Sequence, residues 1–202
     1  MVDALDAVVS TRRRRSDARR SVEAILNAAC AVLGERPNAS MEEIATSAGV
    51  TRQTVYAHFP TRDALVGTII EKAGAEALSA LDAARLDTRA PAEALTGFLD
   101  IGWQFLRRYL PLLLNSTVTH PHRVGPDDPH HPITTRLEQI IQRGQRAGDF
   151  DGALPPSWLA DAILRIGHTA AEHQASGQLS PPKAAALLHE SALRLCGAAT
   201  RH

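Results

Sequence analysis

The stretch of residues 40–65 constrains the fold of this chain more than any other part of it. Ser40 is followed three positions later by Glu43, which has the form of a capping box and predicts a helix that starts directly after the serine. Gly49 is predicted to end this helix, because glycine readily adopts the left-handed conformation found at helix C-termini. The stretch therefore opens with one short helix that has defined ends.

A second short helix is predicted over about residues 52–59. Thr51 can cap its beginning, and Pro60 ends it. Two short helices joined by a tight turn that contains glycine are typical of a helix-turn-helix. The alternative is an ordinary helical hairpin with a polar outer face, because the local pattern also occurs in unrelated proteins.

The second helix is predicted to have one apolar and one polar face. Val55 and Phe59 lie one turn apart and are expected to point into the protein. The opposite face carries Arg52, Gln53 and Tyr56 around a small alanine. Arginine can bond guanine edges, glutamine can bond adenine edges, and a small side chain lets a helix approach a thymine methyl group. The polar face therefore suits the major groove of DNA.

Five short blocks along this stretch are specific enough to indicate a family. They are Ile44-Ala45, Ala48-Gly49-Val50-Thr51, Thr54-Val55-Tyr56, His58-Phe59-Pro60 and Arg62-Asp63-Ala64-Leu65. Together they resemble the DNA-binding domain of the TetR family of transcriptional regulators. The Tyr-x-x-Phe pair, followed by a basic residue and Ala-Leu, is the distinctive part. The resemblance covers about residues 17–70.

The resemblance implies roles for individual side chains. Arg52 and Gln53 would touch base edges, and Arg19 or Arg20 would help from the preceding helix. Phosphate contacts are implied for Thr51, Tyr56, His58 and Arg62. The complete expected DNA-binding set is Arg19, Arg20, Ser40, Thr51, Arg52, Gln53, Thr54, Tyr56, His58 and Arg62.

One corner departs from the family pattern. A glycine is usual where the first helix turns toward the second, whereas this chain has Glu35-Arg36-Pro37-Asn38 there, with Gly34 just before. We therefore expect a turn of different shape at this corner.

The composition indicates an all-α protein of about nine helices in total. The chain has 202 residues, of which 44% are hydrophobic and 4% aromatic, and a net charge of +0. Residues 11–62 nevertheless hold nine arginines against five acidic residues. This basic excess predicts a DNA-facing N-terminal module beside a module with another task. The resemblance implies that these are a three-helix DNA-binding domain over residues 17–62 and a larger C-terminal effector-binding and dimerisation domain over residues 63–202.

Residues 1–16 show no convincing core pattern and contain the run Arg12-Arg13-Arg14-Arg15. Such a run is typical of a flexible basic arm in solvent. The functional alternative is an arm that adds phosphate or minor-groove contacts.

The C-terminal domain contains a long predicted helix, from Pro91 to about Val118, that gathers much of the aromatic content. Stripes of aromatic and aliphatic side chains usually form a core, but they also line apolar ligand pockets. His168 is either a core histidine with its own hydrogen-bond partner or a residue that contacts the ligand. The expected effector-binding residues are Phe98, Trp103, Leu106, Leu110, Leu113, Thr117 and His168.

The last two predicted helices are apolar on more than one side. In the TetR family the final two helices form the four-helix bundle of a dimer, so the resemblance implies a homodimer. The expected interface residues are Trp158, Ile163, Ile166, Leu188 and Leu195.

Residues 120–132 combine four histidines and two aspartates with four prolines and one glycine. The prolines exclude a helix and predict a surface loop. Both a metal site and a mobile connection without metal remain open for this segment.

The sequence contains none of the common catalytic or nucleotide-binding motifs, so we expect no enzyme, no catalytic residue, no cofactor and no metal centre. No signal peptide or membrane-spanning run is present, which predicts a cytoplasmic protein without a membrane partner. Cys30 and Cys196 have no pairing or metal spacing and are expected to be small buried residues.

The resemblance implies a repressor that binds a palindromic double-stranded DNA operator and is released by a small-molecule effector. The alternative is a helical DNA-binding architectural or interaction factor that senses no ligand. Nothing in the sequence decides between repression and activation, or identifies the effector and the operator.

Overall fold

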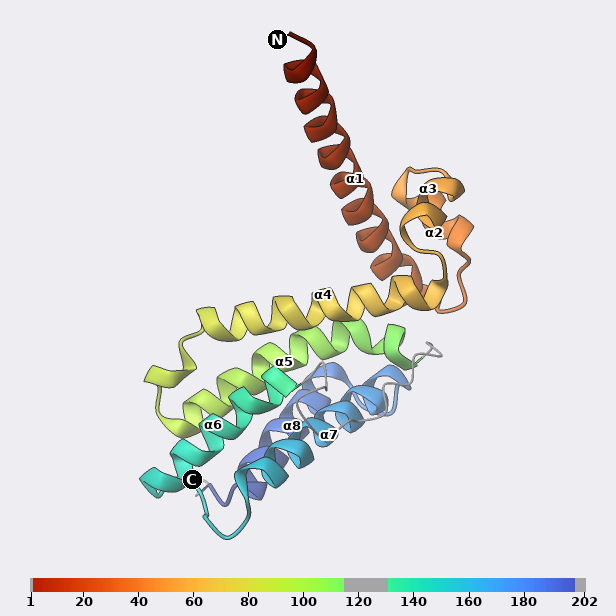
Figure 1. Cartoon of the computed structure of the whole chain (residues 1–202). Helices are drawn as coiled ribbons and strands as arrows, with labels where there is room; N and C mark the ends of the chain where they lie inside the picture. Colours follow the sequence, from red (N-terminus) through yellow and green to blue (C-terminus); the bar gives the residue numbers. More distant parts are fainter. Residues whose placement is uncertain (1, 115–130, 199–202) are drawn as a thin grey trace. The chain divides into compact units, whose positions relative to one another are not determined.

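The computed structural model describes residues 2–114 and 131–198 (Figure 1), and for residues 2–15, 110, 111, 113 and 114 it describes the backbone alone. All regular structure in these ranges is helical, which confirms the predicted all-α class. The elements are α1 (Val2–Glu35), α2 (Met41–Ala48), α3 (Arg52–His58), α4 (Arg62–Ala83), the 3-10 helix η1 (Leu86–Thr88), α5 (Pro91–Leu114), α6 (His131–Ala147), α7 (Pro156–Ala175) and α8 (Pro181–Leu195). These eight α-helices of the described part are close to the nine expected.

The contacts divide the described residues into two compact units. The first unit holds residues 2–69 and 111–114, and the second holds residues 70–110 and 131–198. Helix α4 begins in the first unit and ends in the second. The expected border between residues 62 and 63 therefore stays a prediction.

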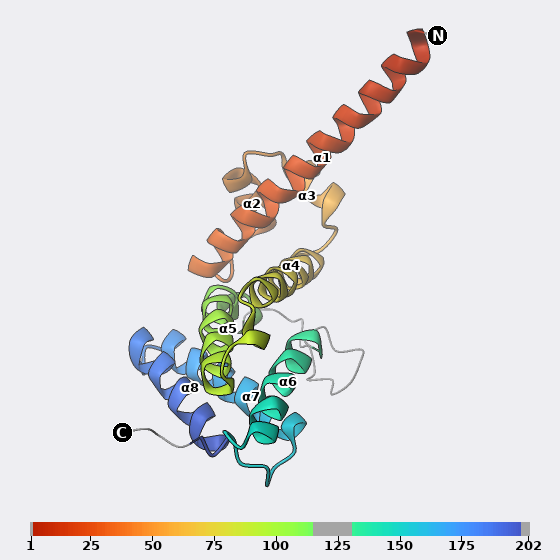
Figure 2. The ribbon, with the colours of Figure 1, turned by 90° about the vertical axis from the view of Figure 1, so that its left-hand side faces the viewer.

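Helix α1 starts at Val2 and not at about Asp17, where the apolar pattern predicts its beginning. Figure 2 shows it as one unbroken coil. The physical reason is local propensity, because no glycine or proline interrupts the chain before Gly34 and the segment is rich in alanine and arginine. That residues 1–16 form a flexible arm in solution stays a prediction.

The first unit has a small core made by one face of each helix. Helix α1 packs on α2 and α3, and α2 packs on α3. The buried side chains include Ile25, Leu26, Ala29, Val32 and Leu33 of α1, Met41, Ile44 and Ala45 of α2, Val55 and Phe59 at α3, and Leu65, Val66 and Ile69 of α4. This core fixes the two short helices, which are too short to be stable alone.

The second unit has a larger core, in which α7 packs between α6 and α8. The turn after α6 is held from both sides: the Phe150 ring lies against Gly144, and the backbone N–H of Asp151 donates to the carbonyl of Cys196 at 2.9 Å. The connection after α4 is held by Arg143, which donates to the carbonyls of Leu86, Asp87 and Arg89. None of the helices in the described part of the chain is both long enough and apolar enough to cross a membrane.

Cys196 closes this core with an exposed fraction of 0%. Burial raises the pKa of its thiol from 9.0 to about 11. Because the pKa of the folded state is the higher one, the stability it contributes is fully present below about pH 9 and is lost as the pH rises toward 11.

We therefore expect iodoacetamide at about pH 8.5 to leave Cys196 unmodified in the folded protein and to alkylate it completely in denaturant. Mass spectrometry of the peptide that contains Cys196 measures both reactions. Equal alkylation rates in the two states would contradict the burial of this thiol.

Candidate nucleic-acid interface

The capping box predicted before α2 is present. The backbone N–H of Glu43 donates to the Ser40 hydroxyl at 3.2 Å, and the backbone N–H of Ser40 donates to the Glu43 carboxylate at 2.8 Å. Arg36 pairs with the same carboxylate. The pKa of Glu43 is lowered, first by the backbone hydrogen bond from Ser40 and then by the serine hydroxyl and Arg36. The start of α2 is thus fixed by bonds that its own sequence supplies.

The turn between α2 and α3 also follows the prediction. Gly49 has φ +67°, and its N–H donates back into the last turn of α2. This left-handed conformation is costly for residues with a Cβ atom. Thr51 then caps α3 by accepting from the backbone N–H of Thr54 at 3.1 Å, and the two hydroxyls lie 2.8 Å apart. The turn therefore sets the direction in which α3 leaves α2.

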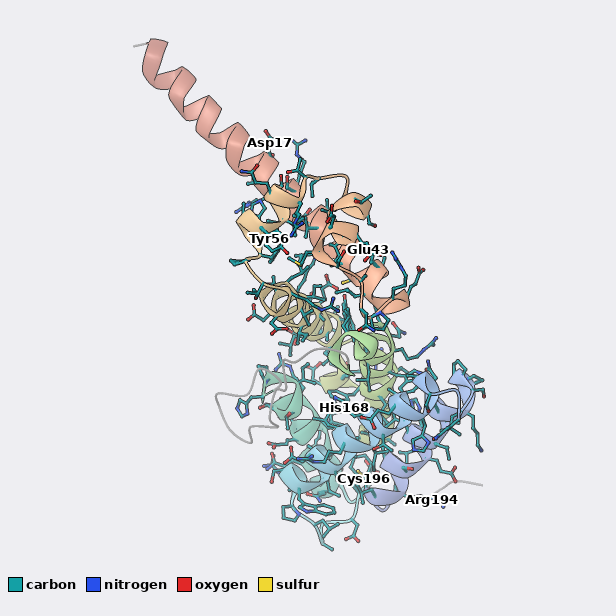
Figure 3. All side chains as sticks on the ribbon, turned by 90° about the vertical axis from the view of Figure 1, so that its right-hand side faces the viewer. Asp17, Glu43, Tyr56, His168, Arg194 and Cys196 are labelled. Atoms are coloured by element: carbon teal, nitrogen blue, oxygen red, sulfur yellow. The ribbon has the colours of Figure 1, made fainter. Side chains whose placement is uncertain are left out.

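Helix α3 is anchored by its apolar side. Val55 has an exposed fraction of 0% and Phe59 of 5%, whereas Tyr56 is 40% exposed. Tyr56 is labelled in Figure 3. Arg52 and Gln53 are exposed as well. The structure therefore brings the three polar residues expected at the DNA together on the outer face of one short helix.

The Arg52 side chain is held above this face by two contacts. Its guanidinium lies 5.4 Å from the centroid of the Tyr56 ring, and one of its nitrogens lies 3.4 Å from a carboxylate oxygen of Glu42. Both charged side chains are largely exposed, so the ion pair alone contributes little to stability. Glu42 was missed by the sequence analysis, since ten residues of sequence separate it from Arg52.

The remaining expected DNA-binding residues differ in their surroundings. Arg19 is exposed, while Arg20 pairs with Asp17 within α1. His58 is half-buried at the end of α3. Arg62 is half-buried, and its guanidinium donates to the carbonyl of Ala39 at 2.6 Å and to that of Pro37. The structure thus places Arg62 inside the domain, apart from the polar face of α3.

Residues 25–69 match the sequence model of the bacterial regulatory proteins of the tetR family. The matched range contains the end of α1, the helix-turn-helix and the beginning of α4. This part of the chain therefore has the sequence of a TetR-type DNA-binding region. The pattern of residues 44–65 described above lies within this match.

Solved structures of TetR-type regulators share the fold over most of the chain. A regulatory protein of the tetR family from Rhodococcus RHA1 is 24% identical with a TM-score of 0.70, over 89% of this chain and 98% of that one. LfrR from Mycobacterium smegmatis, in complex with proflavine, is 21% identical with a TM-score of 0.62, over 86% of this chain and 94% of that one. SmeT, in complex with triclosan, is 20% identical with a TM-score of 0.64, over 86% and 90%. No curated protein matches the sequence.

The residues expected to bind an effector lie on α5 and α7. Phe98 and Trp103 are buried in the core of the second unit, and Leu106 packs against it. His168 is half-buried, with its Nδ1 2.8 Å from the carbonyl of Leu164 in its own helix. The side chains of Leu110 and Leu113, and all of Thr117, lie outside the described residues.

The residues expected at a dimer interface fall into two groups. Ile163 and Leu188 are 1% and 3% exposed, because they belong to the core of their own chain. Ile166 and Leu195 are half-buried against that core, whereas Trp158 is 53% exposed. Of this set, Trp158 offers the largest free apolar surface.

The histidine-rich segment 120–131 lies outside the described residues except for His131, which is exposed at the start of α6. Among the residues that the structure does describe, no three histidine, cysteine or acidic side chains converge as metal ligands would. The choice between a metal site and a mobile loop therefore stays open for this segment.

Proposed function

We propose that this chain is a TetR-type repressor that binds a palindromic DNA operator as a homodimer and leaves it when a small molecule binds. The observation that carries the proposal is the outer face of α3, where Arg52, Gln53 and Tyr56 stand exposed on a helix anchored from behind by Val55. A helix of this kind enters the major groove, and two copies in a symmetric dimer reach half-sites about 34–36 Å apart or a multiple of that.

Within this proposal residues 17–62 bind DNA, residues 63–202 bind the effector and the second copy, and residues 1–16 add phosphate contacts. The last two helices form the dimer, with Trp158 as the exposed anchor and Ile166 and Leu195 beside it. Such a regulator works at the chromosome, so we place it in the cytoplasm.

Base reading is assigned to Arg52 and Gln53. Arg52→Ala should weaken binding to the preferred operator by about 1–3 kcal/mol and relax the preference at one base position, because a bidentate arginine–guanine contact is lost. Fluorescence anisotropy with the operator and with single-base variants measures both effects.

Arg146→Ala is the matched control, since it removes an exposed arginine from the end of α6 and changes the net charge equally. It should bind every sequence as the unaltered protein does. An Arg52→Ala protein that loses the same factor on all DNA sequences would count against base reading by Arg52.

The effector is inferred to be an aromatic compound. LfrR and SmeT were solved with proflavine and with triclosan, which are both aromatic compounds. In this chain Phe98, Trp103 and Leu106 supply apolar surface on α5. We place the effector beside this helix. Ligand sites are generally lined by apolar side chains, with a few polar groups that orient the ligand.

Release is a shift between two conformations. An effector that prefers the state in which α4 is displaced would move the two copies of α3 out of register with their half-sites. Tight binding without such a preference would change nothing.

The test begins with selection of bound fragments from random duplex DNA, followed by a screen for compounds that release the selected fragment. A ligand that saturates the C-terminal domain and leaves the operator affinity unchanged would refute release by effector. It would favour the second candidate, an architectural factor that keeps the DNA-binding heads.

A further inference from the structure

Arg62 makes two long-range hydrogen bonds at the corner between α1 and α2. It is the first residue of α4, and its half-buried guanidinium donates to the backbone carbonyls of Ala39, at 2.6 Å, and of Pro37. These acceptors lie 23 and 25 residues earlier in the chain. The contact therefore joins two segments that are far apart in sequence.

Two carbonyls of the corner accept hydrogen bonds from this guanidinium. The backbone bonds of the corner run from Arg36 to Val32 and from Ala39 to Arg36, and among the described residues no backbone N–H reaches the carbonyls of Pro37 or Ala39. Proline also has no N–H with which to brace the turn. An arginine fork satisfies two neighbouring carbonyls at once, which a single ammonium group does less well.

The same two bonds close a loop that contains the helix-turn-helix. The segment between Pro37 and Arg62 contains the whole of α2 and α3. Tying its two ends together restricts how far α3 can shift relative to α1, because chain closure removes conformational freedom. The fixed ends lie just before the capping box of α2 and three residues after Phe59, which anchors α3 in the core.

We propose that Arg62 is a positioning residue, which holds α3 in the orientation that reads DNA by clasping the Pro37–Ala39 corner. In this role it binds no phosphate, unlike the role that the family resemblance implies for it. The inference rests on the proposed DNA binding and names the residue that keeps its interface aligned. Because Arg62 is the first residue of α4, a displacement of the first turn of α4 would also displace this corner.

Two substitutions separate a clasp from a phosphate contact. Arg62→Lys keeps the positive charge and loses the fork, and Arg62→Ala loses both. For a clasp, both variants should bind the selected operator at least tenfold more weakly, while the slope of log affinity against log salt stays unchanged. A phosphate contact predicts instead that Arg62→Ala lowers the steepness of the slope by about 1.8, which is about 0.9 for each copy in the dimer, and that Arg62→Lys binds like the unaltered protein. That result would overturn the proposal.

A second measurement is independent of DNA. Hydrogen exchange of the peptide that covers residues 36–45 should become at least tenfold faster in both variants, whereas peptides from α7 and α8 should be unchanged. Binding is measured at a temperature where circular dichroism shows each variant fully folded. A residue that only adds stability would leave the affinity of the folded variant unaltered, and this outcome also refutes positioning.

The two proposals fail in distinguishable ways. If the unaltered protein binds no duplex DNA at low salt, the proposed function is wrong, and the exchange of the corner peptide then decides whether Arg62 clasps it. If the corner peptide exchanges at the same rate in all three proteins, the clasp is refuted whatever the affinity for DNA.

Discussion

Replacing Val55 with aspartate should abolish operator binding, because it removes the anchor of the reading helix. Val55 is fully buried between α3 and the rest of the first unit, with an exposed fraction of 0%. An unpaired carboxylate there costs several kcal/mol, and so small a domain has only a few kcal/mol of stability to lose. Circular dichroism should show a loss of helix, and anisotropy should show no specific binding.

Two controls separate unfolding from loss of a DNA contact. Val55→Ala only removes two methyl groups and should weaken the domain by about 1–3 kcal/mol without abolishing binding at low temperature. Gln53→Ala, on the exposed side of α3, should keep the full helix signal and lose affinity for the operator. If Val55→Asp kept both its helix content and its operator affinity, the orientation of α3 described above would be wrong.

Adding one methyl group at Gly144 should destabilise the second unit by about 1–3 kcal/mol or more. A Cβ atom at Gly144 would lie 2.1 Å from Cδ2 and 2.5 Å from Cε2 of the Phe150 ring. The ring has little room to retreat, since it is 4% exposed and the Phe150 N–H donates to the Gly144 carbonyl at 3.2 Å. Urea unfolding of Gly144→Ala followed by tryptophan fluorescence measures the loss.

Gly102→Ala is the matched control, because Gly102 also lies within a helix, α5, and a Cβ atom there would have no neighbouring side chain of the described residues within 4 Å. The same change should therefore be neutral or stabilise the protein by up to about 1 kcal/mol, as alanine is the better helix former. Equal effects at the two glycines would show that the contact with Phe150 does not limit the packing at α6.

Much of the candidate interface could be predicted from the sequence because it depends on local bonds. The capping box at Ser40, the left-handed Gly49 and the cap at Thr51 all join residues within a few positions of each other. The alternation of buried Val55 with exposed Gln53 follows from the helical period alone. Each of these features depends only on residues that are close in sequence, so the local sequence is sufficient to predict it.

The prediction that the first helix begins at about Asp17 is wrong, because it depended on a buried apolar stripe and α1 begins at Val2. No apolar stripe leads into Val22, since residues 10–21 contain no apolar residue except Ala18. Helix propensity, rather than burial, accounts for a helix from Val2. A criterion based on burial cannot detect such a segment.

On its own, the sequence determined the TetR-type helix-turn-helix, the all-helical class and the polar face of α3, because these depend on spacings within one or two helical turns. Only the tertiary structure decided which apolar side chains of α7 and α8 turn inward, and it placed Ile163 and Leu188 in the chain's own core. It also gave the Arg62 guanidinium to the carbonyls of Pro37 and Ala39 and brought Glu42 to Arg52. The contacts of Arg62 and Arg52 join residues ten or more positions apart in the sequence. Where a helix has two apolar faces, only the packing of the folded chain determines which face is buried.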